Sequence, residues 1–421
     1  MARSSPLHTV RSVLGASSTI STAAVAVVSG YLGVLTVAAL SPAGRRRPHP
    51  ARPARRFAIF VPAHDEALAI ARALDAFRAL DYPAELFDVH VVADNCTDST
   101  AEIVRDKGYE VHERTDRDNP GKGPALNWLH DQLVARGDVL DVVVIVDADT
   151  TLAADFLARK NDAFVAGALA AQGYYGVRDP ELSATAGVRY AALACRHHIR
   201  PLGRTVLGGT CGLYGNGMAF DATLLRDRRW SGHLIEDAEF QLELLVDGHL
   251  VTYVPEARIE AEMPDTSAAA TTQNERWELG RLQIAKRFIP VLARRSVARE
   301  SPQRVAVVDA VLDQVVPPLS LVIAADIAAT GLSAVAAIVG VRRARRELIV
   351  VIVSGTVIVL HVLAALHAVR APKALYRSLA SAPQMVTQRA IFLSCGESFG
   401  PPAAHRSNIA SVMVSPLVSC D

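Results

Sequence analysis

Acidic residues that could bind a cation or remove a proton follow one another along the middle of the chain. Asp94 ends the stretch VHVVAD, and Asp147 and Asp149 form an Asp-x-Asp pair after the aliphatic run 142–146. Two carboxylates at the tip of a buried strand suit a hard divalent cation, Mg²⁺ or Mn²⁺, and such a cation can carry a diphosphate. We therefore predict a metal site at Asp147 and Asp149, with Asp94 accepting hydrogen bonds from a base or ribose.

Glu236 and Asp237 stand in the segment IEDAEF, at the start of a predicted helix. A carboxylate there could take the proton of an acceptor hydroxyl as its oxygen attacks an anomeric carbon, an effect of ~10²–10⁴-fold. Alternatively, these residues are only an acidic first helical turn, which suits the helix dipole. Both interpretations can hold together, and we predict Asp237 as the catalytic base.

The pentapeptide QNERW places a planar cation beside a large aromatic ring. Arg276 could neutralise a departing diphosphate, and Trp277 could stack on a sugar ring of the acceptor. The alternative is an Arg and a Trp that anchor an amphipathic helix to the bilayer surface. Lys122 lies between two glycines in NPGKGPALN without the spacing of a Walker loop, and we expect it to contact a phosphate.

The elements that must position these residues alternate between strands and helices from residue 57 onward. FAIFVPA, FDVHVVADN, GYEVHERT and DVVVIVDAD are predicted strands separated by helical stretches. This order predicts an α/β fold with a mainly parallel sheet covered by helices. Ligands bind such sheets beyond the carboxyl ends of the strands, where Asp65, Glu66, Asp94 and the Asp-x-Asp pair fall.

Three uncharged or nearly uncharged regions are long enough to cross a bilayer core of ~30 Å. They lie at residues 19–40, 314–340 and 347–369, and half of all residues are hydrophobic. A signal peptide is the alternative for the first, but its apolar part exceeds the usual ~7–15 residues. The formal net charge of +1 offers no global field for nucleic acid, so no such partner is expected.

Arginines after the first apolar region indicate its cytoplasmic side. We therefore predict an integral protein of the cell (plasma) membrane, in contact with membrane lipids and with its catalytic domain in the cytoplasm. The arginines at 342–346 conflict with this orientation if residues 314–340 cross once, so a re-entrant or double pass within 306–340 is the alternative.

The predicted organisation is an N-terminal segment (1–18), a transmembrane helix (19–40), a basic linker (41–56), a cytosolic catalytic domain (57–265), an amphipathic segment with QNERW (266–305), a transmembrane region (306–340), a transmembrane helix (347–369) and a C-terminal tail (370–421).

Taken together, these motifs resemble the membrane-bound glycosyltransferase family 2, the group that includes cellulose, hyaluronan and poly-N-acetylglucosamine synthases. The resemblance runs from about residue 57 to 290 through VPAHDEA, VVADNCTD, GKGPALN, VDAD, GNGMAF, IEDAEF and QNERW. It implies a Rossmann-like GT-A fold, a UDP-sugar donor and Mg²⁺ or Mn²⁺. It also implies roles at the nucleotide-sugar (Asp65, Glu66, Asp94, Lys122, Asp147), the metal (Asp147, Asp149), the base (Asp237), and the acceptor and diphosphate (Glu236, Gln273, Arg276, Trp277).

We therefore expect an inverting glycosyltransferase that moves a sugar from a UDP donor to a hydroxyl of a glycan or lipid-linked acceptor. Asp65 stands where the family usually has Asn, and the chain has fewer C-terminal spans than the large synthases. Two alternatives stay open: a non-catalytic membrane scaffold with a retained nucleotide-binding domain, and a sugar-phosphate or nucleotidyl transferase.

Overall fold

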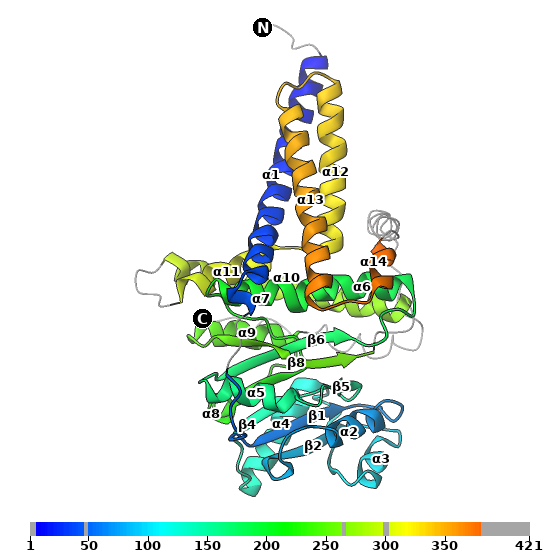
Figure 1. The fold of residues 1–421 in the computed structure, drawn as a ribbon, viewed down its shortest axis with the longest axis vertical. Helices are drawn as coiled ribbons and strands as arrows, with labels where there is room; N and C mark the ends of the chain where they lie inside the picture. The colour runs from blue at the N-terminus through cyan, green and yellow to red at the C-terminus, as the bar shows by residue number, and fades with distance from the viewer. Residues whose placement is uncertain (1–5, 46–48, 234, 263–266, 298–302, 380–421) are drawn as a thin grey trace, which may run out of the picture.

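In the computed structural model, three long helices stand on one side of an α/β domain (Figure 1). The structure describes residues 6–45, 49–233, 235–262, 267–297 and 303–379. Further helices lie between the α/β domain and the helical bundle (Figure 1). The molecule therefore has three levels: a sheet with its covering helices, a helical junction, and a helical bundle.

The α/β domain is built on one mixed sheet of eight strands in the order β3-β2-β1-β4-β7-β6-β8-β5. Strands β3, β2, β1 and β4 run parallel, and β7 reverses the direction by pairing antiparallel to β4 and β6. The predicted α/β fold with a mainly parallel sheet is confirmed. The strands are β1 (Phe57–Ala63), β2 (Phe87–Asp94), β3 (Glu110–Arg114), β4 (Val142–Ile145), β5 (Thr150–Leu152), β6 (Ala170–Val177), β7 (Met218–Asp221) and β8 (Val251–Ala261).

Helices cover both faces of this sheet, which explains why its central strands are almost continuously apolar. Ile59 of β1 packs with the core beneath α2, α3 and α5, whereas Phe60 packs with the core beneath α4, α6 and α9. Both side chains are fully buried. The covering helices are α2 (Ile70–Arg78), α3 (Thr100–Asp106), α4 (Lys122–Arg136), α5 (Phe156–Val165), α6 (Ala184–Ala194), α7 (Arg200–Val206), α8 (Ala222–Leu225) and α9 (Glu236–Val246).

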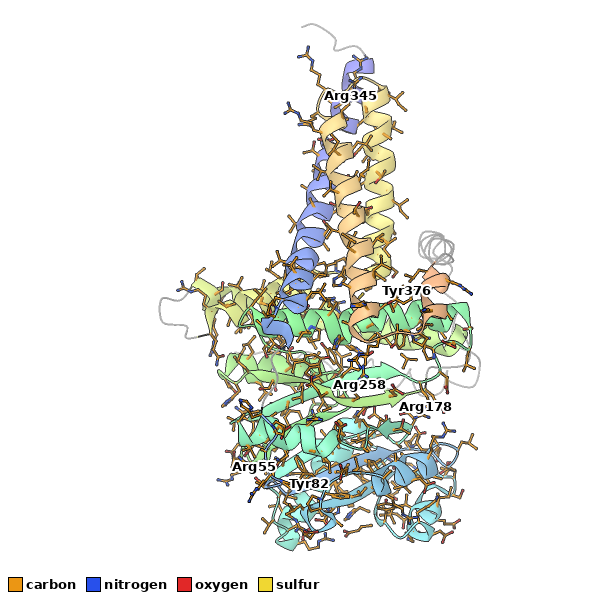
Figure 2. All side chains as sticks on the ribbon, in the orientation of Figure 1. Arg55, Tyr82, Arg178, Arg258, Arg345 and Tyr376 are labelled. Carbon is orange, nitrogen blue, oxygen red and sulfur yellow. The ribbon has the colours of Figure 1, made fainter. Side chains whose placement is uncertain are left out.

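The bundle consists of α1 (Pro6–Leu40), α12 (Leu319–Ile338) and α13 (Ala344–Ala368), each of which is long and apolar enough to cross a membrane. The expected transmembrane region 306–340 is in fact two helices, because α11 (Arg304–Val315) ends before α12 begins. Of these two helices, α12 is the one long and apolar enough to cross a membrane, and the way in which residues 306–340 cross it stays a prediction. Arg345 lies at the end of the bundle far from the sheet (Figure 2).

The junction holds the bundle to the sheet domain through buried ion pairs as well as apolar contacts. The guanidinium of Arg204 on α7 donates to Asp309 on α11 at 2.6 Å, and the hydroxyl of Tyr31 on α1 donates to the same carboxylate at 2.8 Å. Gly203 lies against the backbone of Leu35, so any larger residue there would clash. The junction also contains α10 (Ser267–Val297) and α14 (Lys373–Ser378).

Candidate active site

A cleft of about 440 Å³ opens at the carboxyl ends of β1, β2 and β4. This volume is within the range of small-molecule sites in proteins. The loops that follow these strands leave a crevice at this edge of the parallel half of the sheet. The cleft is lined by Pro62, Ala63, His64, Glu66, Asp94, Pro120, Gly121, Lys122, Ala125, Asp147, Ala148 and Asp149.

Three carboxylates in this cleft repel one another electrostatically. Burial, together with Asp149 and Asp147, raises the pKa of Glu66. Burial and the neighbouring Asp147 likewise raise the pKa of Asp149. A divalent cation would relieve this repulsion, and carboxylate oxygens are the ligands that Mg²⁺ and Mn²⁺ prefer. The residues present therefore fit the metal that the Asp-x-Asp spacing indicates.

Lys122 connects the Asp-x-Asp pair with the glycine-rich segment that precedes β7. It is the first residue of α4, and its ammonium donates to the carboxylate of Asp147 and to the carbonyl of Gly215, the latter at 2.6 Å. Although burial lowers the pKa of Lys122, Asp147 and Glu236 hold it above its usual value. The lysine therefore carries a positive charge in the cleft at neutral pH.

Gly215 brings Asp237 next to Lys122. A β-carbon on Gly215 would lie 3.4 Å from Oδ2 of Asp237 and 3.6 Å from Nζ of Lys122. The φ of Gly215 is +76°, a conformation that L residues with side chains rarely adopt. The glycine thus allows the carboxylate of α9 to approach the cation that is paired with Asp147, although the two acids are far apart in the sequence.

Asp237 and Glu236 form the first turn of α9, and both are half-buried. Burial raises the pKa of Asp237, against the effect of the Ala238 N–H, which donates to its Oδ1 at 2.8 Å. Burial and the charge of Asp237 raise the pKa of Glu236 to about 7. A carboxylate with a raised pKa is a better proton acceptor near neutral pH than an ordinary one.

Asp94 lines the cleft, but its carboxylate already has protein partners. Nη1 of Arg114 donates to its Oδ1 at 2.5 Å, and the N–H of Gly121 donates to its Oδ2 at 3.2 Å. Sequence reasoning missed Arg114. The signal was available, because Arg114 ends the predicted third strand and its partner in the parallel register is Asp94.

Asp65 is not among the residues that line the cleft. It has a φ of +54°, and its Oδ1 accepts hydrogen bonds from the N–H groups of Thr97 and Asp98 at 2.6 and 3.2 Å. The Thr97 N–H above all lowers the pKa of this exposed carboxyl. Asp65 therefore stabilises the turn that follows β2, and its predicted contact with a nucleotide stays a prediction.

The QNERW segment belongs to α10. The side chains of Gln273, Arg276 and Trp277 lie outside the described residues, so their roles stay predictions. Further along α10, Gly280 packs against Ile235, the residue before Glu236. Helix α10 therefore passes directly beside the start of α9, where the candidate base lies.

A second, smaller cavity of about 50 Å³ lies at the junction between α7, α9, α10 and α11. Arg196, Arg200 and Arg204 line it on one side, and Tyr214 and Gln241 on the other. Gln241 is buried, and its amide nitrogen has no protein partner among the described residues. The cavity thus combines a cluster of guanidinium groups with an unsatisfied donor close to the base of the bundle.

Comparison with solved structures shows which known folds this chain is similar to. The fold matches a mannosyltransferase from Pyrobaculum calidifontis, solved with GDP-Man and Mn²⁺, with a TM-score of 0.52 and 20% identity over 84% of this chain and 97% of that one. S. aureus TarS 1-349 with UDP-GlcNAc matches with a TM-score of 0.42 and 17% identity over 72% and 90%. The first match confirms the predicted GT-A fold.

Residues 53–280 match the sequence model described as "Glycosyltransferase like family 2". The match covers more than half of the chain, and the chain belongs to this family. It is therefore a glycosyltransferase, as the motifs predicted. None of the curated proteins searched matches the sequence.

Proposed function

We propose that this protein transfers a sugar, with inversion, from a UDP-sugar to a hydroxyl of a glycan or lipid-linked acceptor at a membrane. One observation supports this proposal above the others. The ammonium of Lys122 donates to Asp147 of the candidate diphosphate site and interacts electrostatically with Asp237, the candidate base. A nucleotide-sugar whose diphosphate lay beside Asp147 would thus have its sugar near Asp237.

The donor side of the cleft has the groups that a nucleoside diphosphate requires. Asp147 and Asp149 would hold the metal, which when bound supplies Lewis-acid stabilisation of the departing diphosphate. Lys122 adds a positive charge beside the same site. Asp94, held by Arg114, would accept hydrogen bonds from the nucleoside.

The acceptor side has a half-buried carboxylate for proton removal. Asp237 would accept the proton of the acceptor hydroxyl while its oxygen forms a bond to the anomeric carbon. The bond from that carbon to the diphosphate breaks in the same step, and the leaving group is UDP. A single displacement of this kind inverts the configuration, and the raised pKa of Asp237 suits a base that works near neutral pH.

The long apolar helices support an acceptor presented at the membrane. Three helices long enough to span a bilayer stand beside the sheet domain, and the small arginine-lined cavity lies between them and α9. Arg196 of that cavity also stabilises the charge of Asp237. Arg200 and Arg204 of the same cavity are paired with Asp313, so Arg196 is the arginine of this lining that acts on the candidate base. In this arrangement the catalytic domain lies on the cytoplasmic side of the cell membrane. Nucleotide-sugars are made in the cytoplasm.

The experiment that tests this function is a panel of radiolabelled nucleotide-sugars incubated with purified membranes and Mg²⁺ or Mn²⁺. The panel contains several UDP-sugars and also GDP-mannose, because the mannosyltransferase of similar fold was solved with that donor. We expect release of a nucleoside diphosphate from one donor, and loss of transfer in Asp237→Asn with donor binding retained. Unchanged turnover in Asp237→Asn would remove the base assignment. Release of UMP or pyrophosphate would indicate a sugar-phosphate or nucleotidyl transferase, and donor binding without any turnover would indicate a scaffold.

A further inference from the structure

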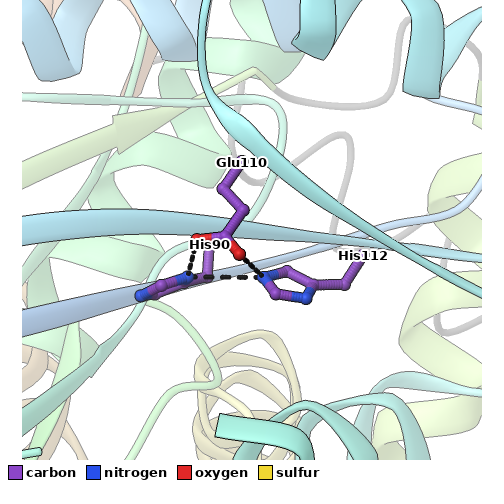
Figure 3. A group of neighbouring side chains, drawn as sticks. All are labelled: His90, Glu110 and His112. Carbon is purple, nitrogen blue, oxygen red and sulfur yellow. Dashed lines mark hydrogen bonds and ion pairs between the residues drawn. The ribbon is translucent and has the colours of Figure 1, made fainter. Parts of the chain in front are cut away.

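A group of two histidines and one glutamate lies on the edge of the sheet, apart from the cleft (Figure 3). His90 belongs to β2, and Glu110 and His112 belong to the edge strand β3. His90 pairs with Glu110 in the parallel register, and residues two apart on a strand share a face. The three side chains therefore converge on the same face of two neighbouring strands.

The distances within this group match those between the ligands of a tetrahedral metal ion. Nδ1 of His90 lies 3.2 Å from Oε2 of Glu110, Nε2 of His112 lies 3.5 Å from Oε1, and the two nitrogens are 3.3 Å apart. Zinc binds His nitrogen and carboxylate oxygen at ~2.0–2.2 Å, which places tetrahedral ligands ~3.3–3.6 Å apart. The two nitrogens already have this spacing, and a carboxylate oxygen within 4.8 Å of both can supply the third ligand.

The accessibility of the group also suits a metal. A neutral imidazole keeps a proton on one ring nitrogen and leaves the other nitrogen free to act as a ligand. The side chain of His90 is 7% exposed and that of His112 12%, whereas that of Glu110 is 42% exposed. An ion can therefore enter from the side of Glu110, and water can complete the coordination.

Two charged neighbours decide whether Glu110 is free to bind an ion. Arg136, at the end of α4, donates to the carboxylate of Glu110 and also to Oδ2 of Asp138 at 2.5 and 2.8 Å. Asp138 alone accepts two hydrogen bonds from Arg136. The guanidinium therefore stays paired if Glu110 binds a metal instead. With neutral histidines the surroundings carry a net negative charge, which favours a cation.

A second group of possible ligands among the described residues does not share these properties. Asp65, Cys96 and Asp98 lie close together after β2. Their carboxylates accept hydrogen bonds from backbone N–H groups, and burial raises the pKa of the Cys96 thiol. This group is a hydrogen-bonded turn, in contrast to the histidine group.

We propose that His90, Glu110 and His112 bind a divalent transition-metal ion of the zinc class, with water as the remaining ligand. Imidazole nitrogens select such metals over Mg²⁺ and Ca²⁺, so this site differs in chemistry from the carboxylates of the cleft. The ion would join the edge strand β3 to β2. Because Arg114 at the end of β3 holds Asp94 in the cleft, the ion would stabilise the strand pair that positions that contact.

The test is a zinc titration of the purified full-length chain after chelation, in excess Mg²⁺ so that the cleft carboxylates are occupied. We expect one zinc ion with imidazole in its first shell by X-ray absorption, and a rise in the unfolding temperature. His112→Gln and His90→Gln should lower zinc affinity by at least the ~10–100-fold seen when second-shell partners are lost.

Two matched variants separate this site from others. His249→Gln, the same substitution away from the group, and Asp149→Asn, in the cleft, should both keep the zinc affinity of the unmodified chain. The X-ray absorption spectrum of the unmodified chain needs no variant, so it decides the matter even if a histidine variant folds poorly. Zinc bound without imidazole, or bound equally well by folded His112→Gln, would overturn the proposal. Because no transfer assay enters, failure here leaves the proposed function unaffected.

Discussion

Replacing Arg114 by Met should reveal how much the cleft depends on one buried ion pair. The side chains of Arg114 and Asp94 are only 5% and 7% exposed, and Nη1 donates to Oδ1 at 2.5 Å. Removing one partner of a buried pair costs ~3–5 kcal/mol, because the other charge stays buried without compensation. Asp94 would keep the N–H of Gly121 at 3.2 Å and the amide of Asn95 at 3.1 Å. We therefore expect the lower end of this range.

The assays are thermal unfolding of the purified protein and donor affinity in the same buffer. A loss of about 3 kcal/mol should lower the unfolding temperature by roughly 6–12 °C in a domain of this size. The double variant Asp94→Asn/Arg114→Met removes both charges, so it should regain part of the stability, with a coupling energy of ~0.5–3 kcal/mol. It should not regain donor affinity if the carboxylate of Asp94 binds the nucleoside.

A matched control is Arg105→Met, which breaks an ion pair with Glu113 whose side chains are 50% and 58% exposed. An exposed pair contributes ~0–1 kcal/mol, so this variant should unfold close to the unmodified protein. The reasoning about burial is refuted if Arg114→Met and Arg105→Met have equal stability. If Asp94→Asn is destabilised but binds donor normally, Asp94 has a structural role only.

Three further outcomes follow from the charges in and near the cleft. Glu236→Gln removes a negative charge beside Asp237, so the fall of kcat/KM at acidic pH should move to lower pH. A pH–rate profile measures this shift. If the acidic limb of the profile did not move, Asp237 would be excluded as the base. Asp149→Asn should lower metal affinity in a Mn²⁺ titration while zinc binding at the histidine group persists. Burial lowers the pKa of Lys160 to about 7, and its ammonium donates to the carbonyls of Ala171 and Gly217. Between about pH 7 and the ordinary lysine pKa of ~10.4, Lys160 is protonated in the unfolded chain but not in the folded one. The free energy of unfolding should therefore rise with pH in this window. Lys160→Met should abolish that slope in thermal unfolding.

The residue pattern alone was enough to predict the parallel half of the sheet and the family. Strands such as 57–63 and 87–94 are short apolar runs bounded by turns, and a helical period follows each of them. Because strand ends in such a fold meet at one edge, the meeting of Asp94 with Asp147 and Asp149 also followed from the order of elements. These are local signals, and they are readable without any knowledge of packing.

The antiparallel half of the sheet depends on packing between distant segments. Strands β5 and β7 have three and four residues and no clear period, and β7 is recognisable only because β4 and β6 lie on either side of it. The separation of α11 from α12 is a different case, because it has a local cause. The break falls at Pro317 and Pro318, and a proline and the residue before it do not continue a helix.

The sequence by itself determined which residue types could do the chemistry, the order of the strands that carry them, and the three helices long enough for a bilayer. Only the tertiary structure decided that Lys122 lies between Asp147 and Gly215. It also decided that Arg114 forms an ion pair with Asp94, and that two histidines lie beside Glu110 at the sheet edge. The physical reason is the range of the interactions. Periodicity and turn chemistry act between neighbours in sequence, whereas ion pairs and ligand groups depend on strand register and on backbone approach that glycine permits at a few positions.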